Sequence, residues 1–375
     1  MTSSPNLLFH IKNRIHQNGP LPFATFMQEV LYAPDLGYYV TGHAKLGQGG
    51  DFVTAPEISP LFSYCIARQC QEILMELNGG EVLEFGAGSG KMALDILHFL
   101  EREHTLPSHY YILEISPDLT ARQQQLFQQH APHLLSRVQW LNTLPENFIG
   151  VMLANEVLDA MPVHRFKKIP HGFQEIFVDY QHNQFLEVVG EPTPILAKAL
   201  QTLSLTFSHD YESEINLWIQ PWLNSVKHSL KKGVVLLIDY GFPRHEYYHP
   251  ERHQGTLMCH YQHRAHSDPY RHMGFQDITA HVDFTAVAEA ALQSGLQLAH
   301  YTHQAAFLCN LGITDMIDTT DETQRFSHIQ HIKQLTLPHE MGELFKVIAL
   351  TQAYLKPLKG FQLLDHVERL MPLSS

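Results

Sequence analysis

Short apolar runs alternate with segments of helical periodicity through most of this chain. Runs of about four to eight mostly apolar residues, bounded by turn-forming residues, are typical of strands buried inside a sheet. The segments 91–100, 117–130 and 284–295 instead repeat their apolar residues at the spacing of an amphipathic helix. The expected strands lie within residues 81–86, 109–116, 138–142, 151–159, 233–241, 297–312 and 345–352. Strands that alternate with helices predict an α/β fold, with a mostly parallel sheet and helices on both faces.

The spacing of these runs divides the chain into a regular core and several additions. Residues 1–77 read as a helical segment followed by a loop, 78–350 as the core, and 351–375 as a tail. Long gaps between expected strands predict insertions into the core. These insertions lie at about 166–230, 241–282 and 310–340. Together with the N-terminal segment, they are the natural material for a substrate-binding lid.

Composition narrows the class of partner. The 375 residues carry a formal net charge of −13, and binding to a nucleic-acid backbone needs a dense Lys and Arg face, so no nucleic-acid partner is expected. No apolar run approaches the roughly 20 residues that a membrane-spanning helix needs, so no membrane span is expected. The four cysteines are scattered and the N-terminus lacks the pattern of a secretory signal, which predicts a cytoplasmic protein with reduced thiols.

A turn rich in glycine follows the first core strand. Gly86, Gly88 and Gly90 alternate with other residues there, and a helix follows. This pattern is typical of a nucleotide-like ligand at the start of a helix. A phosphate-binding loop is disfavoured because Lys91 is followed by Met92 instead of Ser or Thr. A dinucleotide fingerprint is also disfavoured, because it places its third glycine three residues after the second.

Two acidic residues on the first two core strands indicate which ligand this is. Glu84 lies inside the first strand, two residues before the first glycine. A carboxylate there would repel a pyrophosphate, but it suits a ligand with an ammonium and a sulfonium. Glu114 ends the second strand, where acidic residues of nucleoside-binding sheets accept hydrogen bonds from ribose hydroxyls. Together these features predict a site for S-adenosylmethionine.

Several longer stretches resemble the MidA family of S-adenosylmethionine-dependent methyltransferases. They are VLEFGAGSGKMALDIL, YYILEIS, GDFVTAPEIS, NEVLDAMPVHRF, LLIDYGFP and GFQDITAHVDFT. The resemblance implies a class I methyltransferase fold, a Rossmann-like seven-stranded sheet whose last strand is inserted antiparallel. The family includes a mitochondrial complex I assembly methyltransferase, so the resemblance also implies methylation of an arginine in a protein substrate such as a complex I-type subunit. A homodimer is a further expectation.

Acidic residues after the fourth strand are candidates for gripping the methyl acceptor. Carboxylates hold a guanidinium through bidentate hydrogen bonds. Glu156 and Asp159 are three residues apart, so one helical turn would bring both to the same face. Asn155 precedes them and is placed to touch the amino-acid part of the cofactor. The alternative interpretation is an acid that caps the next helix.

The stretch GDFVTAPEIS is expected to form a flap that closes over the cofactor. It contributes Asp51, Thr54, Glu57 and Ser59, an expectation that rests largely on the family resemblance. Ser59 also precedes a proline and a long helical pattern, so it is a candidate helix cap as well.

Histidines raise two further questions. His281 and Asp283 alternate on an extended piece, so both side chains should point the same way and could orient a substrate or accept a proton. A buried pair that holds the insertion in place is the alternative. Histidines also gather at 260–272 beside Cys259, but they lack the paired spacing of a zinc site, so no metal is expected.

The acceptor stays open at this point. Met258 and Cys259 follow GTL, where the mitochondrial pattern carries an Arg, and this difference affects the inferred substrate more than the cofactor. The main hypothesis is a protein arginine methyltransferase. The alternatives are a small-molecule methyltransferase and an assembly or binding factor that keeps the cofactor pocket without turnover.

Overall fold

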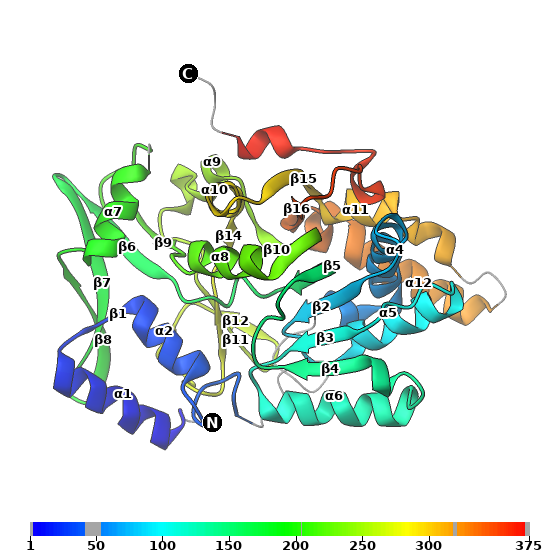
Figure 1. Ribbon diagram of the computed structural model, residues 1–375. Coiled ribbons are helices and arrows are strands. Elements are labelled where there is room, and N and C mark those ends of the chain that lie inside the picture. The colour runs from blue at the N-terminus through cyan, green and yellow to red at the C-terminus, as the bar shows by residue number, and fades with distance from the viewer. Residues whose placement is uncertain (1–2, 42–53, 204, 318–320, 372–375) are drawn as a thin grey trace.

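The computed structural model describes residues 3–41, 54–203, 205–317 and 321–371. A large central sheet has helices on both faces, and a smaller sheet lies beside it with helices of its own (Figure 1). The expected α/β fold is confirmed by this architecture.

The central sheet carries its strands in the order β15–β16–β10–β5–β2–β3–β4. Their bounds are β2 Glu81–Phe85, β3 Tyr110–Leu113, β4 Val138–Leu141, β5 Phe148–Asn155, β10 Leu230–Phe242, β15 Gln297–His303 and β16 Phe345–Gln352. β16 pairs antiparallel with both β10 and β15, as the family resemblance implied. A two-residue strand, β14 (Val282–Asp283), also pairs with the end of β10. The sheet therefore has eight strands, one more than the resemblance implied.

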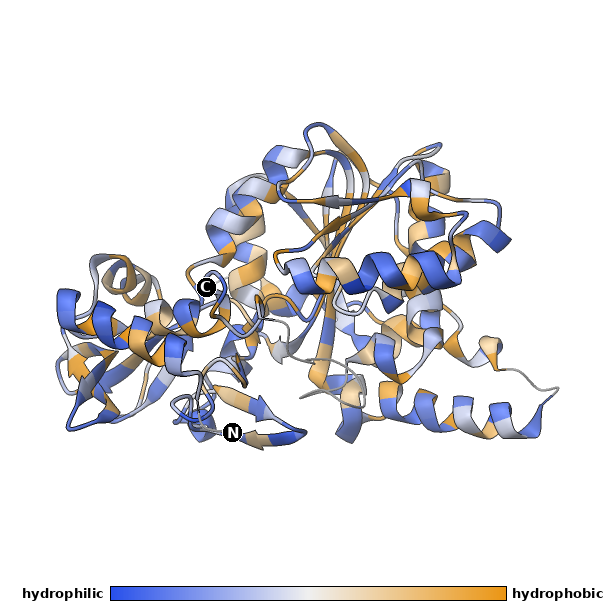
Figure 2. Cartoon of the chain, turned by 90° about the horizontal axis from the view of Figure 1, so that it is seen from below, coloured by the Kyte–Doolittle hydropathy of each residue, from blue (hydrophilic) through white to orange (hydrophobic). Residues whose placement is uncertain are grey.

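Helices cover both faces of this sheet because its strands are apolar on both sides. Val82, Val151 and Val234 pack into one core with α4 (Pro60–Glu76) and α5 (Lys91–Arg102). Their chain neighbours Leu83, Met152 and Val235 pack into a second core with α8 (Ile219–Ser229) and α10 (Phe284–Ser294). Figure 2 shows hydrophobic strands between helices that turn hydrophilic faces outward. The remaining helices beside the sheet are α3 Ala55–Ile58, α6 Pro117–His130, α9 Arg244–Tyr247, α11 Gln304–Asn310 and α12 Glu322–Thr336.

The smaller sheet joins the N-terminal segment to the insertion after β5. Its strands are β1 Leu21–Pro22, β6 His164–Ile169, β7 Gly172–Gln181, β8 Gln184–Gly190 and β9 Glu212–Ile215. β1 pairs antiparallel with β7. The helices α1 (Pro5–Asn18), α2 (Phe23–Tyr32) and α7 (Pro194–Thr202) belong to this part of the molecule, on the left in Figure 1.

A three-stranded ribbon connects the two parts. It consists of β11 Met258–Tyr261, β12 Arg264–His266 and β13 Asp277–Thr279. Buried side chains of the ribbon, such as Cys259 and Ile278, share a core with Phe26 and Val30 of α2. This packing brings the N-terminal segment and the ribbon to the same edge of the central sheet. Among the described residues, no helix has both the length and the apolar composition to cross a bilayer.

Candidate active site

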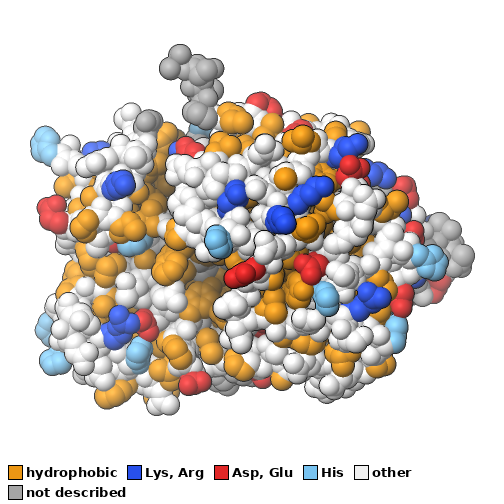
Figure 3. All heavy atoms as spheres, viewed as in Figure 1, with side chains coloured by type: hydrophobic (Ala, Val, Ile, Leu, Met, Phe, Trp, Pro, Cys, Tyr) orange, Lys and Arg blue, Asp and Glu red, His pale blue; other side chains and the backbone are white. Residues whose placement is uncertain are grey.

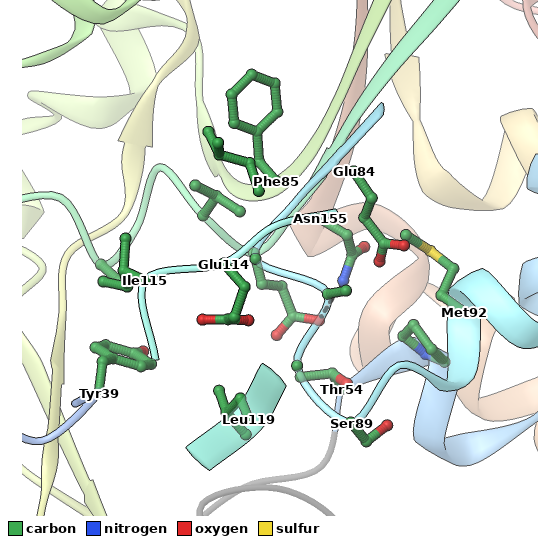
Figure 4. Close-up of a pocket in the computed structure, with 18 of the residues that line it drawn as sticks. Tyr39, Thr54, Glu84, Phe85, Ser89, Met92, Glu114, Ile115, Leu119 and Asn155 are labelled. Atoms are coloured by element: carbon green, nitrogen blue, oxygen red, sulfur yellow. Dashed lines mark hydrogen bonds between the residues drawn. The ribbon is translucent and has the colours of Figure 1, made fainter. Parts of the chain in front are cut away.

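A cavity of about 290 Å³ opens at the carboxyl ends of β2, β3 and β5. Ligands of open α/β sheets bind at this edge, because helix starts and strand ends converge there. Core residues line one part of the cavity, and Tyr32 and Tyr39 of the N-terminal segment line another. Figure 4 shows acidic side chains pointing into this space from two strands. In Figure 3 the surface is hollowed between the smaller sheet on the left and the central sheet on the right.

The glycine turn has the backbone conformation that requires glycine. Gly86, Gly88 and Gly90 have φ angles of 60°, 56° and 84°, which is the left-handed region. Gly86 and Gly88 line the cavity, whereas Gly90 precedes α5 as its N-cap residue and does not line it. A Cβ atom on Gly90 would lie 3.1 Å from the Cγ atom of Gln123 on α6. Gly90 therefore allows α6 to pack close to the turn.

Glu84 enters the cavity from the middle of the central sheet. Its side chain is buried, and the Tyr110 hydroxyl donates a hydrogen bond of 2.6 Å to its Oε2 atom. Burial raises the pKa of Glu84 to about 7, although this hydrogen bond acts in the opposite direction. A cationic group placed beside Glu84 would favour the ionised carboxylate.

Glu114 is held in place at the end of β3. Its Oε1 atom accepts from the Ser116 backbone N–H at 3.0 Å, and its Oε2 atom accepts from Gln123 Nε2 at 3.1 Å. Gln123 also donates to the Gly88 carbonyl oxygen at 2.9 Å and accepts from Trp140 Nε1 at 2.8 Å. The amide of Gln123 thus fixes Glu114 relative to the glycine turn. Sequence reasoning missed Gln123, although a polar residue on the buried face of a helix is a usable signal.

Glu156 lies in a left-handed turn, not in the helical turn that the sequence predicted. Its φ angle is 53°, and its backbone N–H donates to the Ile238 carbonyl oxygen at 2.9 Å. The following N–H groups, of Leu158 and Asp159, donate to Asp239 Oδ2 at 3.0 and 3.3 Å. Because a side chain on β10 satisfies these donors, the chain does not form the expected helical turn after β5.

Glu156 lines the cavity, whereas Asp159 lies buried behind it. Burial raises the pKa of Glu156 to about 8, and the negative charge of Asp159 adds to this effect. The Tyr240 hydroxyl donates to Asp159 Oδ2 at 2.5 Å, while Asp159 Oδ1 is buried without a hydrogen-bond partner. The two carboxyl groups therefore interact electrostatically, but only Glu156 contacts the cavity.

Asn155 provides a test of whether the cavity fits S-adenosylmethionine. Its Nδ2 atom donates to Glu156 Oε1 at 3.1 Å, and its Oδ1 atom is buried with no hydrogen-bond partner. A buried acceptor of this kind is destabilising unless a donor reaches it. The cofactor's ammonium is such a donor, and Glu84 lines the same cavity with its negative charge. The residues present therefore fit the cofactor.

The predicted flap residues have different surroundings. Thr54 and Glu57 line the cavity, and Glu57 accepts a hydrogen bond from the Ser89 hydroxyl. Ser59 does not line it. Its Oγ atom accepts from the Leu61 backbone N–H at 3.3 Å and caps α4, which is the alternative that the sequence left open. Asp51 lies outside the described residues.

His281 and Asp283 line a second cavity, of about 340 Å³, and not the first. Asp283 Oδ1 caps α10 by accepting from the Ala286 N–H at 3.1 Å, and its Oδ2 atom pairs with Arg244 Nε at 3.1 Å. The His281 ring packs against Tyr240 at 5.1 Å, and burial lowers its pKa to about 4. The structure therefore places both residues away from the cavity where methyl transfer was expected.

Three residues near the first cavity escaped sequence reasoning. The Tyr32 hydroxyl donates to the Ala160 carbonyl oxygen at 2.8 Å, and the Tyr39 hydroxyl donates to Asp277 Oδ2 at 2.8 Å. Asp277 belongs to β13 and is buried. These contacts join segments more than a hundred positions apart in the chain, and no local pattern could have indicated them. Among the described residues, no group of three or more His, Cys, Asp or Glu side chains is arranged to hold a metal ion.

Comparison with known proteins decides the family. A family model of S-adenosyl-L-methionine-dependent methyltransferases matches residues 65–302. The chain belongs to this family. The methyltransferase is 40% identical to a Burkholderia thailandensis protein whose crystal structure holds S-adenosyl-homocysteine, with a TM-score of 0.93 and 98% of each chain covered. A native crystal structure from the same organism gives a TM-score of 0.90 at 39% identity, again over 98% of each chain.

Named relatives of the methyltransferase come from animals. Protein arginine methyltransferase NDUFAF7, mitochondrial, of Bos taurus is 30% identical over 92% of this chain and 83% of its own length. The Danio rerio protein of the same name is 28% identical over 92% of this chain and 86% of its own length. The methyltransferase therefore uses S-adenosylmethionine, as the glycine turn, Glu84 and Glu114 predicted, and the resemblance to the MidA family is confirmed.

Proposed function

We propose that this methyltransferase transfers the methyl group to an arginine side chain of a protein. The observation that carries the proposal is the buried acidic group at one end of the cavity, where Glu156 lies in front of Asp159, Asp239 and Asp277. The negative charges of Asp159 and Asp277 both raise the pKa of Glu156, which requires that they lie close to it. The relatives named as protein arginine methyltransferases support the same acceptor.

The cofactor end of the cavity has its own set of residues. Glu84 and Asn155 would hold the ammonium, and Glu114 the ribose hydroxyls, of S-adenosylmethionine, which when bound supplies an electrophilic methyl group. Gly86 and Gly88 allow the backbone to approach it closely. These roles account for the polar groups of the turn and of strands β2 and β3, and they leave Glu156 for the acceptor.

Glu156 has the chemistry that an arginine acceptor needs. A carboxylate can bind two guanidinium N–H groups and hold the positive charge away from the attacking nitrogen. When a nitrogen–carbon bond forms to the methyl group, one N–H proton must leave the guanidinium. A carboxyl group with a pKa of about 8 can receive this proton near neutral pH. Glu156 would therefore both position the acceptor and accept its proton.

The partner and the location stay proposals. A protein substrate, such as a complex I-type subunit, follows from the family resemblance and from the acidic cavity, and a homodimer stays a prediction. Buried Cys65, Cys70 and Cys259 are free thiols, which supports a reducing compartment such as the cytoplasm. The animal relatives are mitochondrial by name.

The test is transfer of a radioactive methyl group from S-adenosylmethionine into an extract from cells that lack this protein. Labelled material is separated by size, and labelled protein is hydrolysed to identify the methylated amino acid. We expect methylarginine in a protein with the native enzyme, and none with Glu156→Gln. Glu81→Gln is a matched control, because Glu81 lies on β2 outside the cavity and accepts a hydrogen bond of 2.9 Å from Tyr111. Label in a small molecule or in another amino acid would overturn the proposal.

A further inference from the structure

The end of the cavity beside Glu156 has an aromatic wall. Tyr32 ends α2, and Tyr39 follows after a short turn. Their rings lie nearly parallel, with centroids 5.4 Å apart and an angle of 15° between the planes. The ring of Tyr38, which is fully buried, packs edge-on against Tyr39 at 5.0 Å. Both Tyr32 and Tyr39 line the cavity and are only partly buried, so part of each ring remains open to a ligand.

Hydrogen bonds fix the orientation of this wall. The Tyr32 hydroxyl is tied to the Ala160 carbonyl oxygen, in the turn that carries Glu156, and the Tyr39 hydroxyl is tied to Asp277 on β13, both at 2.8 Å. The two rings are thus anchored to two different segments, one from the central sheet and one from the ribbon. A wall anchored at both sides presents a fixed surface, which lowers the entropy lost on binding.

The charges around the wall indicate a cationic ligand. No Lys or Arg is among the described residues that line the cavity. The negative charges of Asp277 and Asp159 both raise the pKa of Tyr32 and Tyr39, after the larger effect of burial. In the proposed cofactor site, Glu84 and Asn155 already account for the ammonium of S-adenosylmethionine. The negative charge beside the tyrosines is therefore left for a second cation.

We propose that Tyr39 and Tyr32, anchored by Asp277 and by the Ala160 carbonyl oxygen, form the binding wall for the guanidinium of the methyl acceptor. The inference rests on the proposed function and adds the surface that selects the acceptor. A guanidinium is planar and stacks on an aromatic ring while its edge binds a carboxylate, whereas an ammonium cannot stack in this way. Glu156 supplies the carboxylate and the tyrosines supply the ring, so the site selects arginine over lysine.

The test measures binding of small probes to the full-length protein saturated with S-adenosyl-homocysteine. The probes are N-acetyl-arginine amide and N-acetyl-lysine amide, titrated by calorimetry or followed by NMR. We expect the arginine probe to bind more tightly than the lysine probe. Tyr39→Leu should weaken the arginine probe about tenfold, because it removes the aromatic face. Tyr39→Phe keeps the ring but loses the bond to Asp277, so the loss should be about two- to threefold.

Controls separate this wall from general damage. Tyr111→Phe also removes a tyrosine–carboxylate hydrogen bond, at 2.9 Å to Glu81, but outside the cavity, and should leave probe binding unchanged. Unchanged affinity for S-adenosyl-homocysteine shows that Tyr39→Leu is folded. If Tyr39→Leu does not fold, the smaller change Tyr39→Phe still decides the question, because it should weaken the arginine probe and leave the lysine probe unaffected.

Three outcomes would overturn the proposal. They are no binding of the arginine probe to the native complex, equal binding of the arginine probe by native protein and both Tyr39 variants, and a Tyr39→Leu effect confined to S-adenosyl-homocysteine. The last would place the wall at the cofactor end of the cavity. Each of these results is compatible with methylarginine in the labelling experiment, in which case the proposed function stands without the wall. Label in another amino acid overturns the proposed function itself.

Discussion

The two ends of the first cavity are built in different ways. The cofactor end comes from one continuous stretch, since Glu84, the glycine turn, Glu114 and Gln123 follow one another along β2, α5, β3 and α6. The acceptor end combines the end of α2, the turn after β5, and β13 of the ribbon, which are far apart in the chain. A cofactor shared by many enzymes can be bound by one local unit. The acceptor, which differs among them, is met by side chains that only the tertiary fold brings together.

The two ends also differ in how their carboxyl groups are balanced. Glu114 accepts hydrogen bonds from Ser116 and Gln123, and Glu84 accepts one from Tyr110. Glu156 accepts one from Asn155 and has Asp159 behind it, which disfavours its ionised form. The acceptor end is therefore the more strained electrostatically in the absence of ligand. It should gain the most from a bound cation, and changes there should affect turnover more than cofactor affinity.

The largest expected effect comes from removing the charge at the acceptor end. Glu156→Gln keeps a group that can hydrogen-bond, but it neither balances the guanidinium charge nor accepts its proton. We expect the rate of methyl transfer, in single turnover on the acceptor that the labelling experiment identifies, to fall by about two orders of magnitude or more. Wild-type turnover in Glu156→Gln would show that Glu156 is structural, and the comparison between the two ends would then fail.

The same carboxyl group should give the reaction its pH dependence. Glu156 has a pKa of about 8, raised from an ordinary value of 4.5, so it is mostly protonated below pH 8 in the protein without acceptor. Only the ionised form balances a guanidinium, so kcat/KM for the acceptor should rise about tenfold per pH unit below pH 8 and level off above it. A bound cation favours the ionised form, so the corresponding rise in kcat should lie at lower pH. A native profile that is flat from pH 6 to 8 would contradict this assignment.

At the cofactor end, the expected effect is on affinity. Glu114→Ala removes the acceptor proposed for the ribose hydroxyls and should weaken S-adenosyl-homocysteine binding by about 1–3 kcal/mol. Asp118→Ala is a suitable control, because Asp118 lies on the neighbouring α6 and pairs with Arg122 at 2.8 Å. Calorimetric titration measures both. If the two variants bind S-adenosyl-homocysteine equally well, Glu114 does not hold the cofactor.

The smallest expected effect separates a helix cap from a cofactor ligand. Ser59→Ala removes the side-chain bond to the Leu61 N–H at the start of α4. It should lower the free energy of unfolding by about 1 kcal/mol and leave affinity for S-adenosyl-homocysteine unchanged. Chemical denaturation and calorimetry test the two parts. A loss of affinity without a loss of stability would return Ser59 to the cofactor site.

Local pattern was sufficient to predict the central sheet and the cofactor end. The strands of the core are short apolar runs, and Gly86, Gly88, Glu84 and Glu114 all line the cavity that the glycine turn predicted. Each of these predictions uses residues within one strand, turn or helix. The cap at Ser59 was foreseen for the same reason, because a capping residue contacts only the next turn of the chain.

Tertiary contacts explain what the sequence could not predict. Asp239 satisfies the backbone donors after Glu156, so the expected helical turn became a left-handed one. Asp283 pairs with Arg244 and lies with His281 at a second cavity, although their spacing suggested an active-site pair. Tyr39 meets Asp277 only because the N-terminal segment packs on the ribbon. In each case the deciding partner lies on another segment of the chain.

The central claim, that the two ends of the cavity serve cofactor and acceptor separately, is tested most directly by one calorimetric comparison. S-adenosyl-homocysteine is titrated into the native protein, Glu156→Gln and Glu114→Ala under identical conditions. The account predicts a Kd within about twofold of native for Glu156→Gln, because groups with no shared partner contribute independently. It predicts a Kd at least about fivefold weaker for Glu114→Ala. Equal weakening in both variants, or weakening in Glu156→Gln alone, would contradict it.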